Sequence, residues 1–307
     1  MMAARHLHRW LFALATIAVA GLAAYGALRN RGQAQPPPAP PIATPGIIGI
    51  PAGAVIVDTR HYRIHSTASP THAADVGQAL EALHAAYAGL FPIREAPGKL
   101  AVVLYRDRTE FSRHNRSSRW AEAFYLDPAC YAYFDVDARN PYHWALHEAV
   151  HQLARKGSGF RRNRWIDEGL ASYFSASQLT GGRLRLGRID HSAYPAWWLS
   201  DIATTTGTPI PLDVLLSGKG GPELDRHVNQ YYLSAWSLTH FLMHHDKGRH
   251  AIAYRTFLEA GADAVAFANH IGPIDALEAA WIPYFRAQVA AASDQQDQES
   301  LVNPEFP

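Results

Sequence analysis

The sequence predicts an α+β fold, in which an N-terminal part with a small mixed sheet is followed by a helical C-terminal part. Short apolar runs rich in β-branched residues recur before residue 139, and apolar residues at helical spacing separate them. From residue 140 onward the helical spacing dominates. The chain has 307 residues, of which 48% are hydrophobic, so it can bury a substantial core.

The first fifty residues are expected to lie outside that core. Residues 10–28 carry no charge, and as a helix they would span about 28 Å, close to the hydrocarbon thickness of a bilayer. They are expected to form a transmembrane anchor or a signal peptide, preceded by a cytoplasmic segment or n-region at 1–9. Residues 29–50 are rich in proline and predict an extended linker. An anchor would leave an extracytoplasmic domain on the membrane, whereas cleavage would give a secreted or periplasmic protein.

Residues 51–139 are expected to form an N-terminal α/β part. A helix is predicted over 71–88, where apolar residues recur at helical spacing. Asp107 and Glu110 fit a capping box at the start of a further short helix. Strands are predicted over residues 54–58, 61–66, 99–105 and 130–136. The last of these strands leads into the next helix.

His147, Glu148 and His151 form an H-E-x-x-H run where a helix is expected. Asn140 suits its N-cap and Gly157 its C-terminal end. Residues four apart share one helix face, so the two imidazoles can bind one Zn²⁺. Glu148 is offset around the helix and can reach a metal-bound water as a general base. The alternative is a buried helix whose histidines only form hydrogen bonds.

Glu168 is the candidate third ligand. It lies in the run Trp-Ile-Asp-Glu-Gly-Leu-Ala-Ser-Tyr at 165–173 and is expected to begin a second helix that ends at 180–182. A catalytic zinc site needs three protein ligands and one open position. A carboxylate in a first helical turn also suits the helix dipole, and this alternative stays open.

The two motifs together resemble those of gluzincin zinc metallopeptidases, and most closely the peptidase MA-like proteins. The shared pattern is H-E-x-x-H-Q followed by W-x-x-E-G-x-A-x-Y-F, and the resemblance spans roughly residues 55–245. It implies a zincin-like catalytic domain that binds one Zn²⁺ per chain through His147, His151 and Glu168. It also implies that the strand at 130–136 can form a sheet edge that pairs with extended substrate. The similarity to aminopeptidase N is more distant. The G-A-M-E-N segment of those enzymes is missing, so their specificity is not carried over.

Tyr232 is the second candidate catalytic residue. Aminopeptidases of this type carry Y-E-K-G-x-A-L at a similar place, and their tyrosine stabilises the tetrahedral intermediate. The resemblance assigns this role to Tyr232, with Ala235 at the glycine position and Tyr231 as the fallback. A phenol hydroxyl can stabilise a developing oxyanion. The alternative is an aromatic pair that packs at the start of a helix.

The zinc-binding helical catalytic part is expected over 140–292, and a polar tail over 293–307. The expected function is that of an exported, membrane-tethered zinc metallopeptidase that acts on a peptide or protein. The alternative is a non-catalytic metal-binding scaffold or binding module of the cell envelope. The formal net charge of +1 gives no reason to expect a nucleic-acid partner, and Cys130, as the only cysteine, permits no intrachain disulfide. The sequence leaves the oligomeric state open.

Overall fold

The computed structural model describes residues 46–93, 98–116, 121–160, 163–203, 207–217 and 224–302. The expected membrane segment at 10–28 and the segment at 1–9 lie outside these stretches, as does most of the expected linker at 29–50. Within the described stretches, no helix combines the length and the apolar character needed to cross a membrane.

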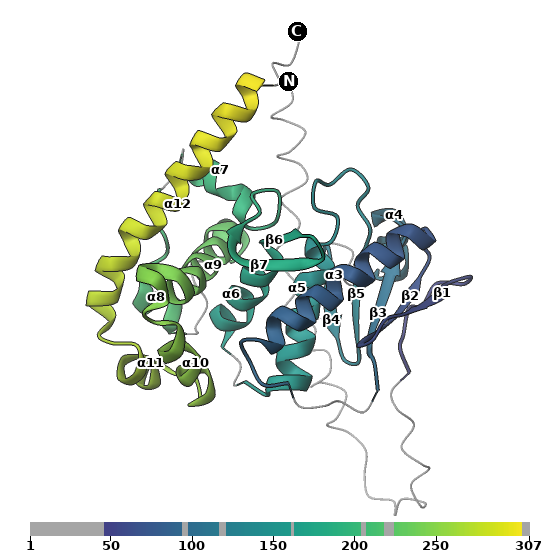
Figure 1. Ribbon diagram of the computed structural model, residues 1–307, viewed down its shortest axis with the longest axis horizontal. Coiled ribbons are helices and arrows are strands. Elements are labelled where there is room, and N and C mark those ends of the chain that lie inside the picture. The colour runs from purple at the N-terminus through teal and green to yellow at the C-terminus, as the bar shows by residue number, and fades with distance from the viewer. Residues whose placement is uncertain are drawn as a thin grey trace, which may run out of the picture.

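A five-stranded mixed sheet forms the N-terminal part of the fold, as the sequence predicts (Figure 1). Its order is β1-β2-β3-β5-β4, with parallel pairs β2/β3 and β3/β5 and antiparallel pairs β1/β2 and β4/β5. The strands are β1 (Val55–Asp58), β2 (Tyr62–Ser66), β3 (Leu100–Tyr105), β4 (Phe124–Leu126) and β5 (Ala129–Tyr133). All four predicted strands are therefore present, and β4 is an addition to them.

The expectation that residues 130–136 form a sheet edge is wrong. β5 lies between β3 and β4, and it ends at Tyr133. The short β4 forms the edge instead, with Phe124 opposite Tyr131. A strand of three residues is too short for an alternating pattern to reveal it in the sequence.

Helices cover both faces of the sheet centre. On one face lie α3 (Pro70–Ala88) and α5 (His143–Leu153), and on the other lies the short α4 (Arg108–His114). β3 reflects this arrangement, because Val102 belongs to the large core beneath α3 and α5 whereas Val103 belongs to a smaller core beside α4. With both faces covered, every residue of β3 is buried, which explains its continuous apolar run.

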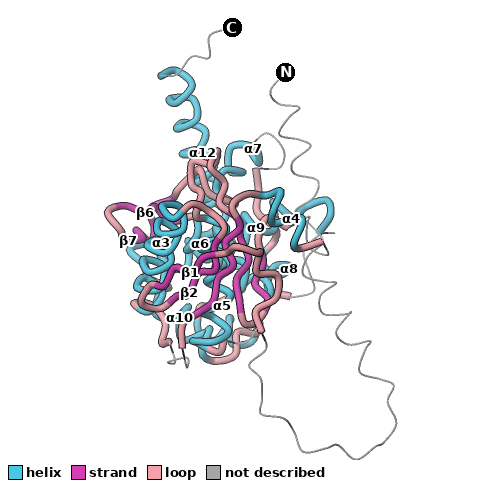
Figure 2. Tube along the Cα trace, turned by 90° about the vertical axis from the view of Figure 1, so that its right-hand side faces the viewer, coloured by secondary structure: helices cyan, strands magenta, loops and turns pink. Residues whose placement is uncertain are grey.

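The rest of the fold is helical apart from one hairpin. The hairpin pairs β6 (Ser177–Thr180) with β7 (Arg183–Ile189). The helices of this part are α6 (Arg164–Ser175), α7 (Leu199–Ala203), α8 (Leu212–Leu216), α9 (Leu224–Gly248), α10 (Ala251–Glu259), α11 (Ala264–His270) and α12 (Ile274–Val302). Helix α12 includes the first part of the tail expected at 293–307 and ends at Val302. Figure 2 shows its C-terminal end extending beyond the other elements.

The boundaries of α5 differ from the prediction. The helix begins at His143, three residues after the expected cap at Asn140. A π-helical turn, Ala154–Ser158, continues it at the C-terminal end. Gly159, with a left-handed φ of 66°, then ends the helix, so the expected end at Gly157 is wrong.

The second motif helix, α6, also starts earlier than expected. It begins at Arg164 and ends at Ser175, so Glu168 lies in its second turn rather than at its start. The expected helix end at 180–182 is the turn of the β6/β7 hairpin, where both glycines have positive φ. Adjacent glycines suit a tight hairpin turn, because such turns need backbone conformations that other residues avoid.

Candidate metal centre

Gln152 fixes α5 against the sheet. Its side-chain amide donates hydrogen bonds to the backbone oxygens of Ala101 and Pro128, at 3.1 and 2.9 Å. Gln152 is fully buried, so these bonds form away from solvent. The glutamine that follows the H-E-x-x-H run therefore sets the position of the helix relative to β3 and β5.

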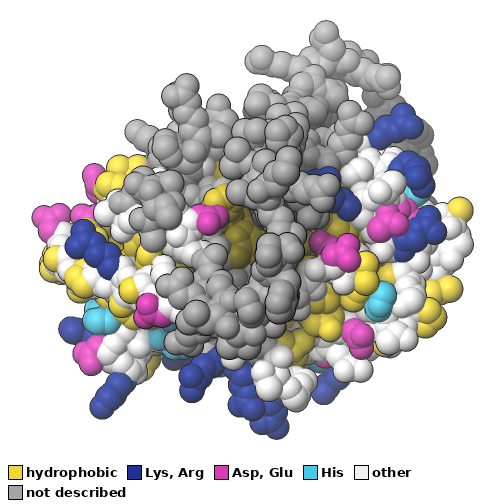
Figure 3. All heavy atoms as spheres, turned by 90° about the horizontal axis from the view of Figure 1, so that it is seen from above, with side chains coloured by type: hydrophobic (Ala, Val, Ile, Leu, Met, Phe, Trp, Pro, Cys, Tyr) yellow, Lys and Arg dark blue, Asp and Glu magenta, His cyan; other side chains and the backbone are white. Residues whose placement is uncertain are grey.

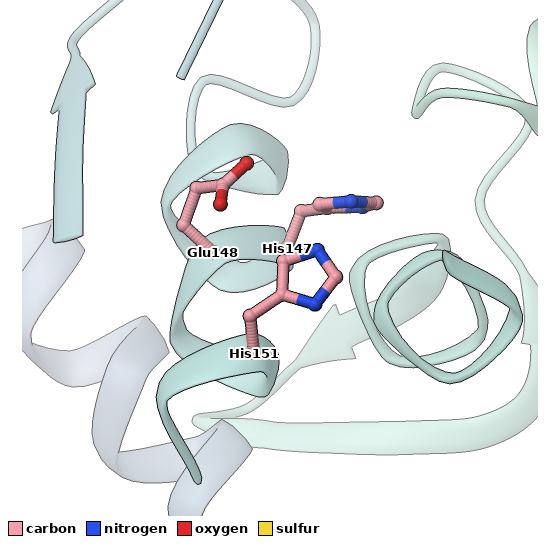
Figure 4. Close-up of side chains that lie close together, drawn as sticks. All are labelled: His147, Glu148 and His151. Carbon is pink, nitrogen blue, oxygen red and sulfur yellow. The ribbon is translucent and has the colours of Figure 1, made fainter. Parts of the chain in front are cut away.

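His147, Glu148 and His151 project from α5 as the sequence predicts (Figure 4). The two imidazoles lie on one side of the helix with ring centroids 5.0 Å apart. One potential ligand atom from each of the three residues lies within 4.8 Å of the others. His147 and Glu148 are buried, and the side chain of His151 is 19% exposed.

Glu168 completes the cluster from α6. Its Oε2 lies 3.2 Å from Nε2 of His147 and 3.7 Å from Nε2 of His151. Nitrogen and oxygen ligands at ~2.0–2.2 Å from a tetrahedral zinc ion stand ~3.3–3.5 Å apart. The two separations from Glu168 are close to that spacing, so the carboxylate lies where it could share a zinc ion with either histidine. The predicted ligand set is thus brought together by two helices.

The second motif explains how α6 is held in place. Trp165 is fully buried and stacks on Phe257, with ring centroids 6.1 Å apart. The hydroxyl of Tyr173 is hydrogen-bonded to Nε2 of His244 at 2.8 Å. Gly169 lets α6 approach α9 closely, since a Cβ there would lie 2.7 Å from the backbone oxygen of Ala235. These contacts on both sides of Glu168 fix its direction.

The charges of the cluster are strongly coupled in the absence of a metal. Burial raises the pKa of Glu168, but hydrogen bonds from His147 and His151 outweigh it, and its pKa is lowered overall. Burial disfavours the charged form of His151, but the Glu168 carboxylate raises its pKa to about 9. Zinc binds neutral imidazole, so metal binding would displace this proton.

Glu148 lies beside the proposed ligands but faces β4. The backbone of Tyr125, in that strand, lies near enough to its carboxylate to favour the charged form. Burial raises its pKa, and the nearby His151 and His147 partly counteract the rise. The edge strand and the helix that carries the candidate base are therefore neighbours. A carboxylate in this position is available for proton transfer and is not needed as a ligand.

The structure separates the two candidate tyrosines. The ring of Tyr232 lies 6.2 Å from the ring of His147, whereas Tyr231 faces Arg164, whose guanidinium carbon is 5.8 Å from its ring centroid. Burial and then the Glu168 carboxylate raise the pKa of Tyr232 well above its usual value. Its hydroxyl therefore keeps its proton and can donate a hydrogen bond. Tyr232, the first choice from the sequence, is the one whose ring lies beside that of His147.

Sequence reasoning missed Tyr194. This buried residue lies between Tyr232 and Trp144, with ring centroids 5.3 and 5.4 Å away. Its hydroxyl donates to Oδ1 of Asn229 at 3.3 Å. Tyr194 follows β7 in an irregular segment without a motif, and only the folded chain brings it to the site. No signal in the sequence alone could have identified it.

Comparison with known proteins adds a family match over part of the chain. Residues 144–259 match a family described as "Protein of unknown function (DUF1570)". The matched segment contains both motifs and the helix that carries Tyr232. No curated protein matches the chain. The description of the family names no activity, so the function is argued from the site.

Proposed function

We propose that this protein is a zinc-dependent metallopeptidase with a zincin-like fold. The observation that carries the proposal is the convergence of Glu168 Oε2 on Nε2 of His147 and His151, with Glu148 beside the cluster. Three nitrogen and oxygen ligands with a neighbouring carboxylate are typical of hydrolytic zinc sites.

His147, His151 and Glu168 would hold the metal. When bound, zinc would polarise a water molecule and the carbonyl of the scissile bond. Glu148 would take the proton of the attacking water and deliver it to the leaving amine. Tyr232 would donate its hydroxyl hydrogen to the oxygen that gains negative charge. Each role requires a side chain that already lies in or beside the cluster.

The edge strand β4 suggests how a polypeptide substrate is held. Within the described part of the chain, only β5 pairs with β4, which leaves its outer edge for an added strand. An extended peptide can bind such an edge through main-chain hydrogen bonds. Because β4 lies beside α5, a peptide on this edge would pass close to the base.

The alternative is a scaffold that keeps a metal without turnover. A structural zinc site usually closes with a fourth protein ligand. Among the residues that the structure describes, the cluster offers three ligands and one carboxylate directed toward β4. This arrangement favours the enzyme, because a structural site needs no base.

The proposal is tested with an unfolded protein such as reduced, alkylated casein. The wild-type chain should hydrolyse it, lose the activity to a zinc chelator and recover it with added Zn²⁺. Hydrolysis that survives complete removal of the metal would refute the zinc mechanism. A folded but inactive wild-type chain that binds zinc would favour the scaffold.

We also propose that the protein is exported and tethered to a membrane through residues 10–28, an uncharged stretch followed by the proline-rich linker. Alkaline carbonate extraction of membranes from the native host tests this directly. A tethered chain should stay in the membrane pellet. Release of the mature chain into the supernatant would rule out the anchor.

A further inference from the structure

A cavity of about 450 Å³ lies at the N-terminal end of α5. We call it the tryptophan cavity, because its lining includes Trp144, Trp197 and Trp198. It falls within the size range of small-ligand pockets, which begins near ~300 Å³. Figure 3 shows the molecule from above, and hydrophobic side chains form the floor of a hollow on that face.

The tryptophan cavity lies next to the candidate metal centre. His143 and Trp144 line it, and they precede His147 on the same helix by four and three positions. The rings of Trp144 and His147 are 6.4 Å apart. One residue of an extended peptide spans ~3.3 Å, so a peptide held at the metal could place a neighbouring side chain in this cavity.

The charge of the lining is mainly negative. It contains the carboxylates of Glu122, Asp135, Asp137 and Asp201 and one guanidinium, that of Arg139. Glu122 is compensated from outside the lining by Arg108, whose Nη2 lies 2.8 Å away. The lining therefore holds four carboxylates and one guanidinium, and the carboxylate of Glu122 is paired with Arg108.

His143 adds a hydrogen-bond acceptor to this wall. Its Nδ1 lies 2.6 Å from the carbonyl oxygen of Asn140. A carbonyl only accepts, so Nδ1 carries the proton and Nε2 is left as an acceptor. His143 is 3% exposed, and its Nε2 has no hydrogen-bond partner among the described residues. The ring of His143 packs against the rings of Trp144 and Trp197, with centroids 4.5 and 5.2 Å away, so it supports two of the indoles that line the cavity.

We propose that the tryptophan cavity is a substrate subsite for a positively charged side chain, with arginine preferred to lysine. Indole faces attract cations, and the carboxylates supply the opposite charge. A guanidinium meets both demands, since it stacks flat on aromatic rings and donates several hydrogen bonds in one plane. This inference names the substrate class of the proposed peptidase and rests on that function.

The test compares two unstructured ten-residue peptides that differ at one position. One carries arginine there, and the other carries citrulline, which has nearly the same shape but no charge. Binding to the zinc-loaded full-length Glu148→Gln protein is measured by calorimetry, so that neither peptide is consumed. We expect the arginine peptide to bind about tenfold more tightly or better. In the double variant Asp135→Asn, Asp201→Asn, the ratio of the two dissociation constants should approach one.

Two controls make the result specific. Asp213→Asn changes an exposed carboxylate on α8, outside the cavity lining, and should keep the full preference. Circular dichroism checks that each variant is folded. Equal binding of both peptides, tighter binding of a phenylalanine peptide, or no detectable binding of any peptide to the folded protein would overturn the subsite.

Hydrolysis of the same peptides by the wild-type chain separates this inference from the proposed function. If the arginine peptide binds more tightly but neither peptide is cleaved, the proposed subsite is supported and the proposed peptidase activity is refuted. If both peptides are cleaved equally well, the peptidase activity is supported and the arginine subsite is refuted.

Discussion

Oε2 of Glu168 lies 3.2 Å from Nε2 of His147, although the two residues are 21 positions apart and belong to different helices. Both side chains are buried, so the contact takes place away from bulk solvent. An isolated His–Glu pair in such a position would be an ordinary ion pair. His151 lies 3.7 Å from the same oxygen, and the three side chains are the ligands of the proposed metal site.

Replacing Glu168 should therefore remove most of the metal affinity. We expect Glu168→Ala and the isosteric Glu168→Gln to weaken zinc binding by at least about 100-fold, more than the usual effect of a residue outside the ligand set. Competition with a zinc-sensitive chelator measures this. The matched control is Asp167→Asn, which changes the adjacent carboxylate and should keep zinc. Full zinc affinity in both Glu168 variants would remove Glu168 from the site.

Three tyrosines near the site should differ in their effects on turnover. Tyr232→Phe should lower kcat by a factor on the order of 10²–10³, the usual scale for one oxyanion donor. Tyr231→Phe should have little effect, because its ring faces Arg164 rather than the cluster. Tyr194→Phe should fall between them, since Tyr194 packs on Tyr232 and bonds to Asn229. A large loss of kcat in Tyr231→Phe together with a normal kcat in Tyr232→Phe would reverse the assignment.

Gly169 should be required for the close packing of α6 on α9. A Cβ at this position would lie 2.5 Å from Oγ1 of Thr239, too close for either helix to stay in place. We expect Gly169→Ala to lower the free energy of unfolding by about 1–3 kcal/mol and to weaken zinc binding, because Glu168 must shift with α6. The control Gly89→Ala meets no atom nearer than 3.4 Å, at a φ of −70°, and should be close to neutral. Equal stability of the two variants in chemical denaturation would contradict this packing argument.

His240 should make stability depend on pH. Burial, and then the neighbouring His244, lower its pKa to about 4, and its Nδ1 is hydrogen-bonded to the hydroxyl of Tyr284. Between the unfolded pKa of 6.5 and this value, the unfolded chain takes up a proton that the folded chain excludes. His240 therefore does not reduce the free energy of unfolding above pH 6.5. As pH falls toward 4, it lowers that free energy by up to about 3 kcal/mol.

Chemical denaturation across this pH range measures the effect. His240→Asn keeps a polar atom near Tyr284 but cannot titrate, so its free energy of unfolding should fall less steeply with acid. Other groups that titrate in this range contribute to both proteins and cancel in the comparison. If the free energy of unfolding fell equally steeply with pH in both proteins, His240 would be protonated as readily in the folded state as in the unfolded chain.

Local patterns in the sequence predicted the fold elements that depend on local interactions. The continuous apolar run of β3 and the two H-E-x-x-H histidines fall in the expected elements. The expected cap at Asp107 is also present, since its carboxylate accepts the N–H of Glu110 at 2.7 Å. Glu110 does not complete the capping box, because its Oε2 accepts the N–H of Arg106 instead.

Features set by distant parts of the chain were not predictable. The hairpin at 180–182 was taken for a helix end, because glycines serve both purposes. The tryptophan cavity joins Trp144 to Trp197 and Trp198, about fifty positions later, and no local pattern connects them. Glu168 could be proposed from the sequence as a third ligand, but its distance to His147 could not, because that distance depends on how α6 packs against α5.

The central claim is that one metal ion and Glu148 together hydrolyse a peptide bond. The most direct measurement is zinc content and casein hydrolysis on the same preparations of the wild-type chain and Glu148→Gln. Because Glu148 is the base and not a ligand, we predict about one zinc per chain in both proteins, with turnover lower by several orders of magnitude in the variant. Full activity in Glu148→Gln, or hydrolysis by a wild-type chain that contains no zinc, would contradict the account.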